Sequence, residues 1–318
     1  YPDSLYFLNS YTLMEMSSKE EILLIDNIEI VNRICGMKVL LILAVLFVFT
    51  FIIIHIYVVI RLEPRRELQI ISHRGASAYA PENTIASIEK ALNLGAANIE
   101  IDVNKTRDNV LVVIHDRRIN RTTEGKGYIR DMLWDEVKLL NAGSYFYKSK
   151  RRSMQTEKNS PPIEYIPKLE TVLEIIKDHK CSLFIEVKKP RLNPNIGTLL
   201  AAAIYRYNLE NSVIIISFDK EWLASFSGQN PEIETGTLHA LPVNLYKVPE
   251  KQFISIHWIN ILLFPFLVTE TQKRGYVVVA WTIDSPLLMK WLIHLGVDAI
   301  TTNKPDVGLR VKSLISGR

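Results

Sequence analysis

The stretch "LQIISHRGASAYAPENTIASIEKALNLGAANIEIDV", residues 68–103, contains one complete strand–helix–strand unit. Two short β-rich apolar runs, "LQIISH" and "ANIEIDV", flank the segment "PENTIASIEKALNLG" at 81–95. This segment begins with Pro and Glu and ends on Gly95, which are the usual start and stop signals of a helix. A strand–helix–strand order of this kind is typical of parallel α/β architecture.

The alternation of apolar β-rich runs with helical patterns continues for about 250 residues, the usual size of a (β/α)8 barrel. We therefore predict an α/β fold of the TIM-barrel class, (β/α)8, over residues 68–316. The predicted strands are 68–73, 97–103, 110–115, 181–188, 212–218, 234–240, 277–283 and 297–303, with a weaker one within 253–264.

One connection departs from this alternation, because only "NKTRDN", residues 104–109, separates two of the predicted strands. A parallel crossover needs a dozen or more residues, so we expect a hairpin here. With a turn centred on residues 108–109, facing residues have numbers that sum to about 217, which places His115 opposite Asp102 and Glu100 one pleat away. The hairpin would bring a histidine to a pair of carboxylates.

Ahead of the barrel, residues 39–60 read "VLLILAVLFVFTFIIIHIYVVI", 22 residues without Asp, Glu, Lys or Arg. At about 1.5 Å per residue, this length crosses a hydrocarbon core of roughly 30 Å. A buried core helix usually keeps a polar stripe and a cleaved signal peptide has a shorter apolar core, so both alternatives fit less well. We predict a single transmembrane helix over residues 37–61, followed by the basic linker "LEPRRE" at 62–67.

The charges around this span give a weak prediction of orientation. Three arginines follow the span and two basic residues precede it, which favours a cytoplasmic barrel in a single-pass membrane protein. Residues 1–36 form an N-terminal segment without recognisable chemistry. If translation begins at Met37, this segment is absent from the cell, and detection of a mature peptide containing "SSKEEILLIDN" would refute that hypothesis.

The overall composition argues against several classes of protein. The 318 residues carry a net charge of +4, with no Lys/Arg-rich helix interleaved with aromatics, so nucleic acid is a poor partner. Two isolated cysteines form neither a disulfide framework nor a thiolate metal site. We expect residues 117–166, with basic residues at 148–152, to be a solvated loop. The apolar stretch 253–268 is too short for a second span, and we expect a barrel strand and loop.

Ionisable side chains gather at the ends of the predicted strands. Glu100 and Asp102 in "IEIDV" are two residues apart, as are Glu186 and Lys188 in "IEVK", so each pair projects from one face of its strand. Buried carboxylates that face one point are costly unless they are paired or hold a cation. Oxygen ligands favour a hard ion, so we predict one divalent cation, Mg²⁺ or Ca²⁺, at the three acids.

The same strand ends supply groups that suit a phosphate ester. Arg74 can bind phosphate by bidentate hydrogen bonds, and Lys188 can bind it as a point charge. His73 and His115 titrate near neutrality, so one can donate a proton while the other accepts one. Each residue alone has an ordinary structural explanation. All of them, however, lie at predicted carboxyl ends of strands, where barrel enzymes place their active sites.

The segments "HRG", "PENT", "EIDV", "VVIHD", "IEVK", "WT" and "ITTNKPD", in this order, resemble the motifs of the glycerophosphodiester phosphodiesterase family. The resemblance covers roughly residues 68–312 and implies a metal-dependent (β/α)8 barrel. It implies that His73 and His115 form a general acid/base pair. It also implies three metal ligands, which are Glu100, Asp102 and Glu186.

The resemblance also implies a set of substrate-binding residues. Arg74 and Lys188 would contact the phosphate. Glu82 and Asn83 fall on the family's "ENT" and would shape the site, and Trp281 would line the pocket wall. One position departs from the family pattern, which commonly has an apolar residue and Asn after "WT". Here Asp284 replaces that Asn, which affects one expected substrate contact.

These observations predict a membrane-anchored phosphodiesterase that hydrolyses glycerophosphodiesters to glycerol 3-phosphate and an alcohol. The nucleophile would be water or the neighbouring glycerol hydroxyl, and the hydroxyl would give a cyclic intermediate. The N-terminal span resembles the membrane-anchored family members, some of which act on lysophospholipids. The alternative is therefore a lysophospholipase D that uses single-chain lipids in the bilayer. A catalytically inactive barrel that senses headgroups fits less well, because every motif position is filled.

Overall fold

The computed structural model describes residues 33, 35–53, 55–56, 66–153, 162–240 and 253–316, and the chain divides into two units, residues 1–57 and 58–318. In the described part of the first unit, the helix Cys35–Ile53 has 19 residues and is long and apolar enough to cross a membrane. This judgement rests on length and composition. Residues 57–61 of the predicted span, nearly all of the N-terminal segment and most of the linker lie outside the described residues.

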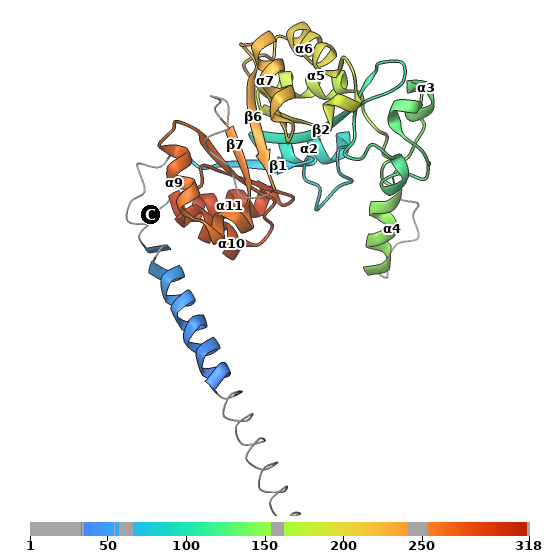
Figure 1. Ribbon diagram of the computed structural model, residues 1–318. Coiled ribbons are helices and arrows are strands. Elements are labelled where there is room, and N and C mark those ends of the chain that lie inside the picture. Colours follow the sequence, from blue (N-terminus) through green and yellow to red (C-terminus); the bar gives the residue numbers. More distant parts are fainter. Residues whose placement is uncertain are drawn as a thin grey trace, which may run out of the picture. The chain divides into compact units, whose positions relative to one another are not determined.

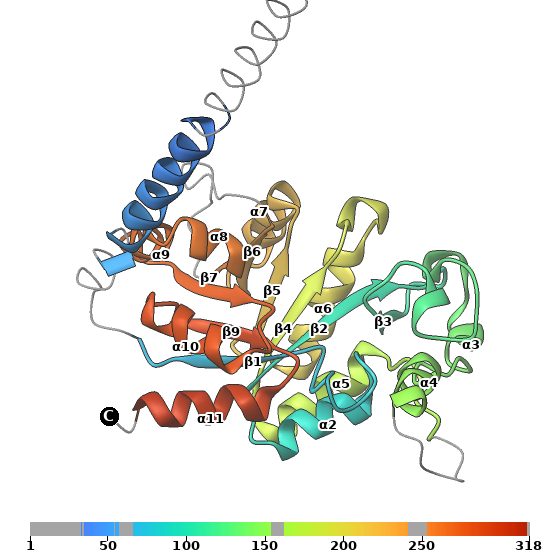
Figure 2. The same cartoon turned by 90° about the horizontal axis from the view of Figure 1, so that it is seen from below.

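The second unit is a barrel of parallel strands closed by the pairing of β1 with β2 (Figures 1 and 2). Within the described residues, the strand order is β1-β9-β8-β7-β6-β5-β4-β2-β3, and all neighbours are parallel except β2 and β3. The predicted (β/α)8 barrel is therefore confirmed. Its parallel strands are β1 (Gln69–His73), β2 (Asn98–Lys105), β4 (Ser182–Val187), β5 (Val213–Ser217), β6 (Glu234–His239), β7 (Phe253–His257), β8 (Val277–Trp281) and β9 (Ala299–Thr302).

The short strand β3 (Leu111–Val113) forms the predicted hairpin with β2, but the register differs by one residue. Ile114, not His115, lies opposite Asp102, and its N–H donates to the Asp102 carbonyl at 2.9 Å. The turn explains the shift, because Thr106 N–H donates to Val110 O at 3.0 Å and closes a turn centred on residue 108. His115 therefore follows the end of the strand and is not part of the ladder.

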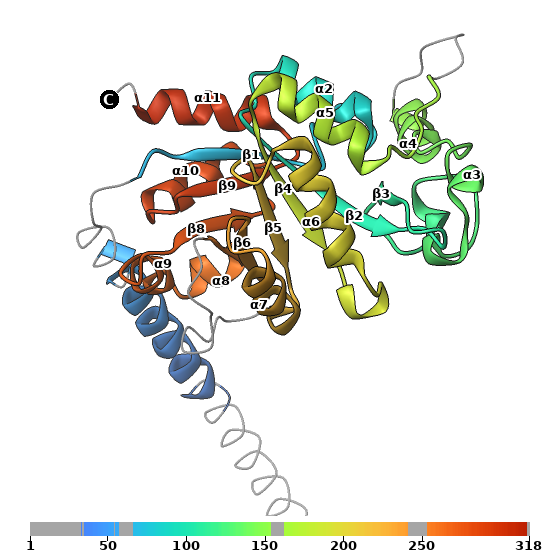
Figure 3. The same cartoon turned by 90° about the horizontal axis from the view of Figure 1, so that it is seen from above.

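Helices surround the barrel on its outer side (Figure 3). They include α2 (Ile85–Asn93), α5 (Leu169–His179), α6 (Ile196–Tyr207), α7 (Lys220–Gln229), α9 (Phe266–Gln272), α10 (Pro286–His294) and α11 (Pro305–Ser316). Further helices lie in the connections: η1 (Ile119–Arg121), η2 (Ile129–Asp131), α3 (Trp134–Val137), α4 (Ser144–Ser153), η3 (Pro190–Leu192) and α8 (Trp258–Leu263).

Two regions have more helical structure than expected. The region 117–166 was expected to be a loop but contains η1, η2, α3 and α4, while residues 154–161 lie outside the described residues. The stretch 253–268 begins with β7 as predicted, and α8 and the start of α9 replace the expected loop. Neither region shows the long apolar periodicity that makes a helix recognisable from sequence.

Helix α2 begins at Ile85, four residues after the start predicted at Pro81. Thr84 is the N-cap, and its hydroxyl accepts a hydrogen bond from Ser87 N–H at 3.3 Å in a capping box. Asn83 has a φ of 59°, a left-handed conformation that a helix interior does not contain. Residues 81–84 are therefore a loop, and this loop carries Glu82 and Asn83 toward the strand ends.

The core has an inner and an outer layer because successive strand residues point to opposite faces of the sheet. Ile71 and Phe184 belong to the cluster inside the barrel. Their chain neighbours Ile70, Leu183 and Ile185 belong to the clusters formed with the helices outside. Since all eight parallel strands run the same way, their carboxyl ends meet at one end of the barrel.

Candidate active site

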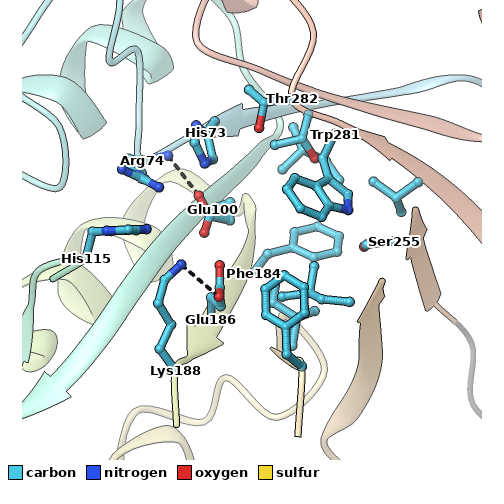
Figure 4. A pocket seen from close by; sticks show the side chains of 16 residues that line it. His73, Arg74, Glu100, His115, Phe184, Glu186, Lys188, Ser255, Trp281 and Thr282 are labelled. Carbon is cyan, nitrogen blue, oxygen red and sulfur yellow. Dashed lines mark hydrogen bonds and ion pairs between the residues drawn. The ribbon is translucent and has the colours of Figure 1, made fainter. Parts of the chain in front are cut away.

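A pocket of about 690 Å³, counting the space open to solvent, lies at the carboxyl ends of the strands (Figure 4). Seven of the ten predicted site residues line it, and the other three lie behind the lining. The seven are His73, Arg74, Glu100, His115, Glu186, Lys188 and Trp281. The position agrees with the rule that barrel enzymes place their sites at this end.

The three predicted metal ligands come together from two neighbouring strands. The register of β2 with β4 pairs Asp102 with Glu186, and Glu100 lies two residues before Asp102. One carboxylate oxygen from each residue lies within 4.8 Å of the others, and all three residues are buried. Burial and the neighbouring carboxylates raise the pKa of Glu100 well above its usual value and that of Glu186 to about 7. The cluster therefore holds more negative charge than its environment favours.

Arg74 and Lys188 partly compensate this charge. Arg74 Nε lies 3.1 Å from Asp102 Oδ2, and its backbone N–H donates to Glu100 Oε2 at 2.9 Å. Lys188 Nζ lies 2.9 Å from Glu186 Oε1 and 3.3 Å from Asp102 Oδ1. Burial alone would raise the pKa of Asp102, but these two cations hold it well below its usual range.

The acid cluster fits a hard divalent cation. Asp102 Oδ1 and Glu186 Oε1 are buried and accept no well-aligned hydrogen bond, although Lys188 lies beside both. A buried anionic oxygen without a hydrogen bond is costly. Three carboxylates at this spacing supply the oxygen ligands that Mg²⁺ and Ca²⁺ prefer. The residues present could thus hold one such ion.

Glu82 and Asn83 support the site from behind, since neither lines the pocket. Asn83 Nδ2 donates to Asp102 Oδ2 at 2.9 Å, and its Oδ1 accepts from Asp102 N–H at 3.1 Å. Glu82 accepts from Arg74 Nη1 at 2.8 Å. These contacts fix a metal ligand and a phosphate-binding candidate in place, so a direct substrate contact is not what the geometry supports for these two residues.

Gly75 permits the close approach of helix α2 to the end of β1. Its φ is 76°, and a Cβ at this position would lie 2.5 Å from the backbone carbon of Ser87. Any other residue would clash with the helix and require an unfavourable left-handed conformation. The "HRG" segment therefore ends the strand, turns the chain and leaves His73 and Arg74 facing the pocket.

His73 is held by an uncharged partner. Its Nδ1 lies 2.7 Å from Asn303 Oδ1, in the loop that follows β9. Burial, with a smaller contribution from the charge of Arg74, lowers the pKa of His73 to about 4. The imidazole is therefore neutral at pH 7 and able to accept a proton.

His115 is held by a charged partner. Its Nδ1 lies 2.5 Å from Asp116 Oδ1, and Arg121 Nε donates to the other oxygen of Asp116. Arg121 also donates to both oxygens of Glu82, at 2.6 and 2.8 Å. Burial lowers the pKa of His115, while its carboxylate neighbours act in the opposite direction. The two imidazoles thus differ in the charge of the group that orients them.

The opposite side of the pocket is mainly apolar, although Ser255 and Thr282 lie beside Trp281. Trp281 lies on this wall and meets Phe218 edge-on at a ring-centroid distance of 5.9 Å. The wall is completed by further side chains from the interior of the barrel: Ile71, Phe184, Ile216, Leu238 and Val279. Apart from Trp281, the sequence analysis did not identify these residues, because their alternation is the same as that of an ordinary barrel core.

Several polar residues around the site were also missed, although sequence signals for some were present. Asp116 directly follows His115 in "VVIHD", and Asn303 lies in "ITTNKPD". Asp284 was expected to affect a substrate contact. It does not line the pocket but accepts from Asn303 N–H at 2.8 Å, so its role is to hold that loop.

A (β/α)8 barrel with acids, basic side chains and imidazoles at its carboxyl ends has the architecture of a barrel enzyme for a charged substrate. The model of the glycerophosphoryl diester phosphodiesterase family matches residues 73–307, and the chain belongs to this family. The family predicted from the motifs is therefore confirmed, and the protein is an enzyme with glycerophosphodiester phosphodiesterase activity.

Known relatives cover most of the barrel. The glycerophosphodiester phosphodiesterase of Caldanaerobacter subterraneus subsp. tengcongensis is 37% identical over 240 residues, which is 74% of this chain and 94% of the relative. Glycerophosphodiester phosphodiesterase 1 of Homo sapiens is 26% identical and covers 70% of this chain and 74% of its own length. An Oleispira antarctica phosphodiesterase, solved in complex with the product sn-glycerol-3-phosphate, has a TM-score of 0.65 at 28% identity, covering 77% of this chain and 96% of that one.

Proposed function

We propose that this enzyme is a metal-dependent phosphodiesterase that hydrolyses glycerophosphodiesters to glycerol 3-phosphate and an alcohol, with His73 and His115 as its general acid and base. The observation that carries the proposal is the convergence of three carboxylates, two basic side chains and two imidazoles on one pocket. The Oleispira antarctica relative, solved with sn-glycerol-3-phosphate, supports this product.

Glu100, Asp102 and Glu186 would hold the cation, Mg²⁺ or Ca²⁺. When bound, such an ion polarises a phosphate oxygen and lowers the pKa of an attacking hydroxyl or water. With the triad charge neutralised, Arg74 and Lys188 would turn to the substrate phosphate, Arg74 by paired hydrogen bonds and Lys188 as a point charge. Their positive charge would then stabilise the negative charge that develops on the phosphate in the transition state.

The two imidazoles would transfer the protons. One would accept a proton from the nucleophile, and the other would donate one to the leaving alkoxide. Both line the pocket, and each binds its supporting residue through Nδ1, which leaves Nε2 for the substrate. Water and the neighbouring glycerol hydroxyl are both compatible nucleophiles, and detection of a cyclic glycerophosphate during turnover would identify the hydroxyl.

We also propose that residues 37–61 anchor the enzyme in a membrane as a single span, with 62–67 as the linker and 68–316 as a catalytic domain on the cytoplasmic side. None of the apolar window of the helix Cys35–Ile53 is buried, whereas the core helix of a soluble domain would be mostly buried. Alkaline extraction of membranes tests this anchor. The full chain should stay with the membranes, and a chain without residues 37–61 should be released.

The apolar wall favours a second candidate, a lysophospholipase D that uses lysophospholipids from the adjacent bilayer. Phe184, Phe218 and Trp281 present aromatic surface beside the acid cluster, which would suit a hydrocarbon chain better than a small polar headgroup. Both candidates use the same triad and histidines. They differ in which substituent of the phosphodiester contacts the wall.

Hydrolysis of glycerophosphocholine and of lysophosphatidylcholine by the purified full chain, side by side and with or without EDTA, tests both candidates. Metal-dependent release of glycerol 3-phosphate from the first substrate alone would support the leading proposal. Preference for the second would move the assignment to lysophospholipase D. Glu100→Ala is the control, and equal activity of this variant would overturn the role of the triad.

A further inference from the structure

We infer that Asp284 and Asn303 are positioning residues that fix the proton of His73 on Nδ1 and so leave Nε2 as the nitrogen that exchanges a proton with the substrate. This inference deepens the proposed function and rests on His73 having a role in catalysis. It follows from which groups in the chain Asp284–Asn303–His73 can donate and which can only accept.

Asp284 determines the orientation of the Asn303 amide. An ionised carboxylate can only accept hydrogen bonds. Its Oδ1 accepts from Asn303 N–H at 2.8 Å and from the Thr302 hydroxyl at 2.9 Å. Its Oδ2 lies 2.7 Å from Asn303 Nδ2, which must be the donor in that pair. The amide nitrogen of Asn303 therefore faces Asp284, and the amide oxygen faces away from it.

The oriented amide in turn determines the tautomer of His73. Asn303 Oδ1 lies 2.7 Å from His73 Nδ1 and 2.8 Å from the Ser77 hydroxyl. An amide oxygen can only accept, so His73 Nδ1 must carry a proton. In the neutral imidazole, Nε2 then holds the free lone pair, and in the imidazolium it holds the transferable proton. The same nitrogen therefore serves the substrate in both charge states.

The fold makes this chain possible because the three residues come from adjacent strands. His73 ends β1, Asn303 follows β9, and Asp284 follows β8, and these strands are consecutive in the sheet. Ile283 N–H donates to Thr301 O at 2.9 Å and brings the β8 loop against β9. This explains why Asp284 is polar although it lies outside the pocket lining.

Asp284→Asn tests the inference because it changes one acceptor into a donor at nearly constant size. The backbone N–H of Asn303 keeps the new Oδ1 in place, so the new Nδ2 faces the Asn303 side chain. Asn303 must then rotate by 180° and present its own Nδ2 to His73. His73 would shift its proton to Nε2 and lose the lone pair that faces the substrate.

The expected result for Asp284→Asn is a fall in kcat of roughly 10²-fold or more, the scale of losing general acid/base catalysis, with KM changed little. Asn303→Asp alone should also be impaired, because it places two carboxylates side by side. In the double variant Asp284→Asn/Asn303→Asp, the amide at position 284 can donate to the carboxylate at position 303, which can in turn accept from His73 Nδ1. This variant should recover most of the activity. Asp306→Asn, which lies on the same segment and contacts Tyr79, is the matched control.

A second readout separates positioning from mere structural support. ¹⁵N NMR of the full chain labelled at histidine, with His73→Gln for assignment, reports which ring nitrogen of His73 is protonated. Nδ1 should be protonated in the wild type and the double variant, and Nε2 in Asp284→Asn. An unchanged tautomer and unchanged kcat in Asp284→Asn would overturn the inference. The NMR result does not depend on turnover, so a wild type without activity would refute the proposed function and leave this test intact.

Discussion

The two sides of the barrel mouth share one pocket but differ in chemistry (Figure 4). Strands β1, β2 and β4 contribute ionisable side chains to the pocket, namely His73, Glu100 and Glu186, whereas β5, β6 and β8 contribute Ile216, Leu238 and Val279. On the ionisable side, buried charges have partners of opposite sign, as Asp102 has in Arg74. This separation indicates that changes on the ionisable side alter the rate, whereas changes on the apolar side alter the choice of substrate.

The largest expected effect comes from removing an imidazole on the ionisable side. His73→Ala or His115→Ala should lower turnover by about 10²- to 10⁴-fold, because each group would transfer a proton. Steady-state kinetics with glycerophosphocholine measure this. His179→Ala, an exposed histidine on α5, is the control for purification and folding. Near-normal turnover in both site variants would show that neither histidine transfers a proton in the reaction.

Glu100→Gln should separate catalysis from stability on the same side. Turnover should fall by about 10²- to 10³-fold, the usual effect of losing a group that stabilises transition-state charge. The metal-free variant should nevertheless unfold at a temperature no lower than the wild type, because one of three mutually repelling carboxylates is gone. Calorimetry in EDTA measures this. A large drop in unfolding temperature would mean that Glu100 stabilises the fold.

Addition of Mg²⁺ or Ca²⁺ should stabilise the wild type, since an ion that binds only the folded state adds about 2.7 kcal/mol at a concentration of 100 times its Kd. Thermal unfolding with and without the ion measures the shift. Glu100→Gln should show a smaller shift because it keeps two of the three ligands. Identical shifts in the two proteins would place the ion elsewhere.

On the apolar side, one buried histidine should make the folding stability depend on pH. His239 is buried at the end of β6 and contacts Thr237. Burial lowers the pKa of His239 to about 4. Below its usual pKa of about 6.5 the unfolded chain takes up a proton that the folded chain does not, so stability is full above that value and falls as the pH drops toward 4. Between pH 6.5 and 5.5 the loss should be about 1 kcal/mol.

The His239→Gln variant should lose less stability over this range, because Gln does not titrate. Urea unfolding of variant and wild type at pH 7 and 5.5 gives the difference, and the contributions of the other titratable groups cancel in this comparison. Parallel pH curves for the two proteins would show that His239 takes up its proton equally well in the folded state.

The residues of the ionisable side were predictable from sequence, whereas those of the apolar side, apart from Trp281, were not. Charged residues at strand ends, such as Glu100 and Asp102, stand out because burial of a charge is costly and therefore indicates a partner. The interior residues Ile216 and Leu238 follow the same period of two as any barrel core. Whether such a residue fills the core or lines the pocket depends on how close it lies to the carboxyl end of its strand. The sequence alone does not specify this position.

The errors in the predicted elements have similar local causes. The hairpin register depends on where the turn closes. The observed register differs from the predicted one by a single residue, so His115 lies beyond the ladder. The late start of α2 depended on Asn83, whose left-handed conformation is coupled to its contact with Asp102. Such long-range contacts override local propensity. They occur near the site because loop side chains there form hydrogen bonds with buried site residues.

The smallest expected effect sharpens the comparison most. Phe218 is 45% exposed at the pocket mouth, so Phe218→Ala should leave the fold intact while removing part of the apolar wall. If this wall binds an acyl chain, KM for lysophosphatidylcholine should rise roughly tenfold, the usual effect of a lost apolar contact in a pocket, with KM for glycerophosphocholine nearly constant. Phe264→Ala, exposed outside the pocket lining, is the matched control. An equal change for both substrates would show that the wall orients the shared glycerophosphate and does not choose the substrate.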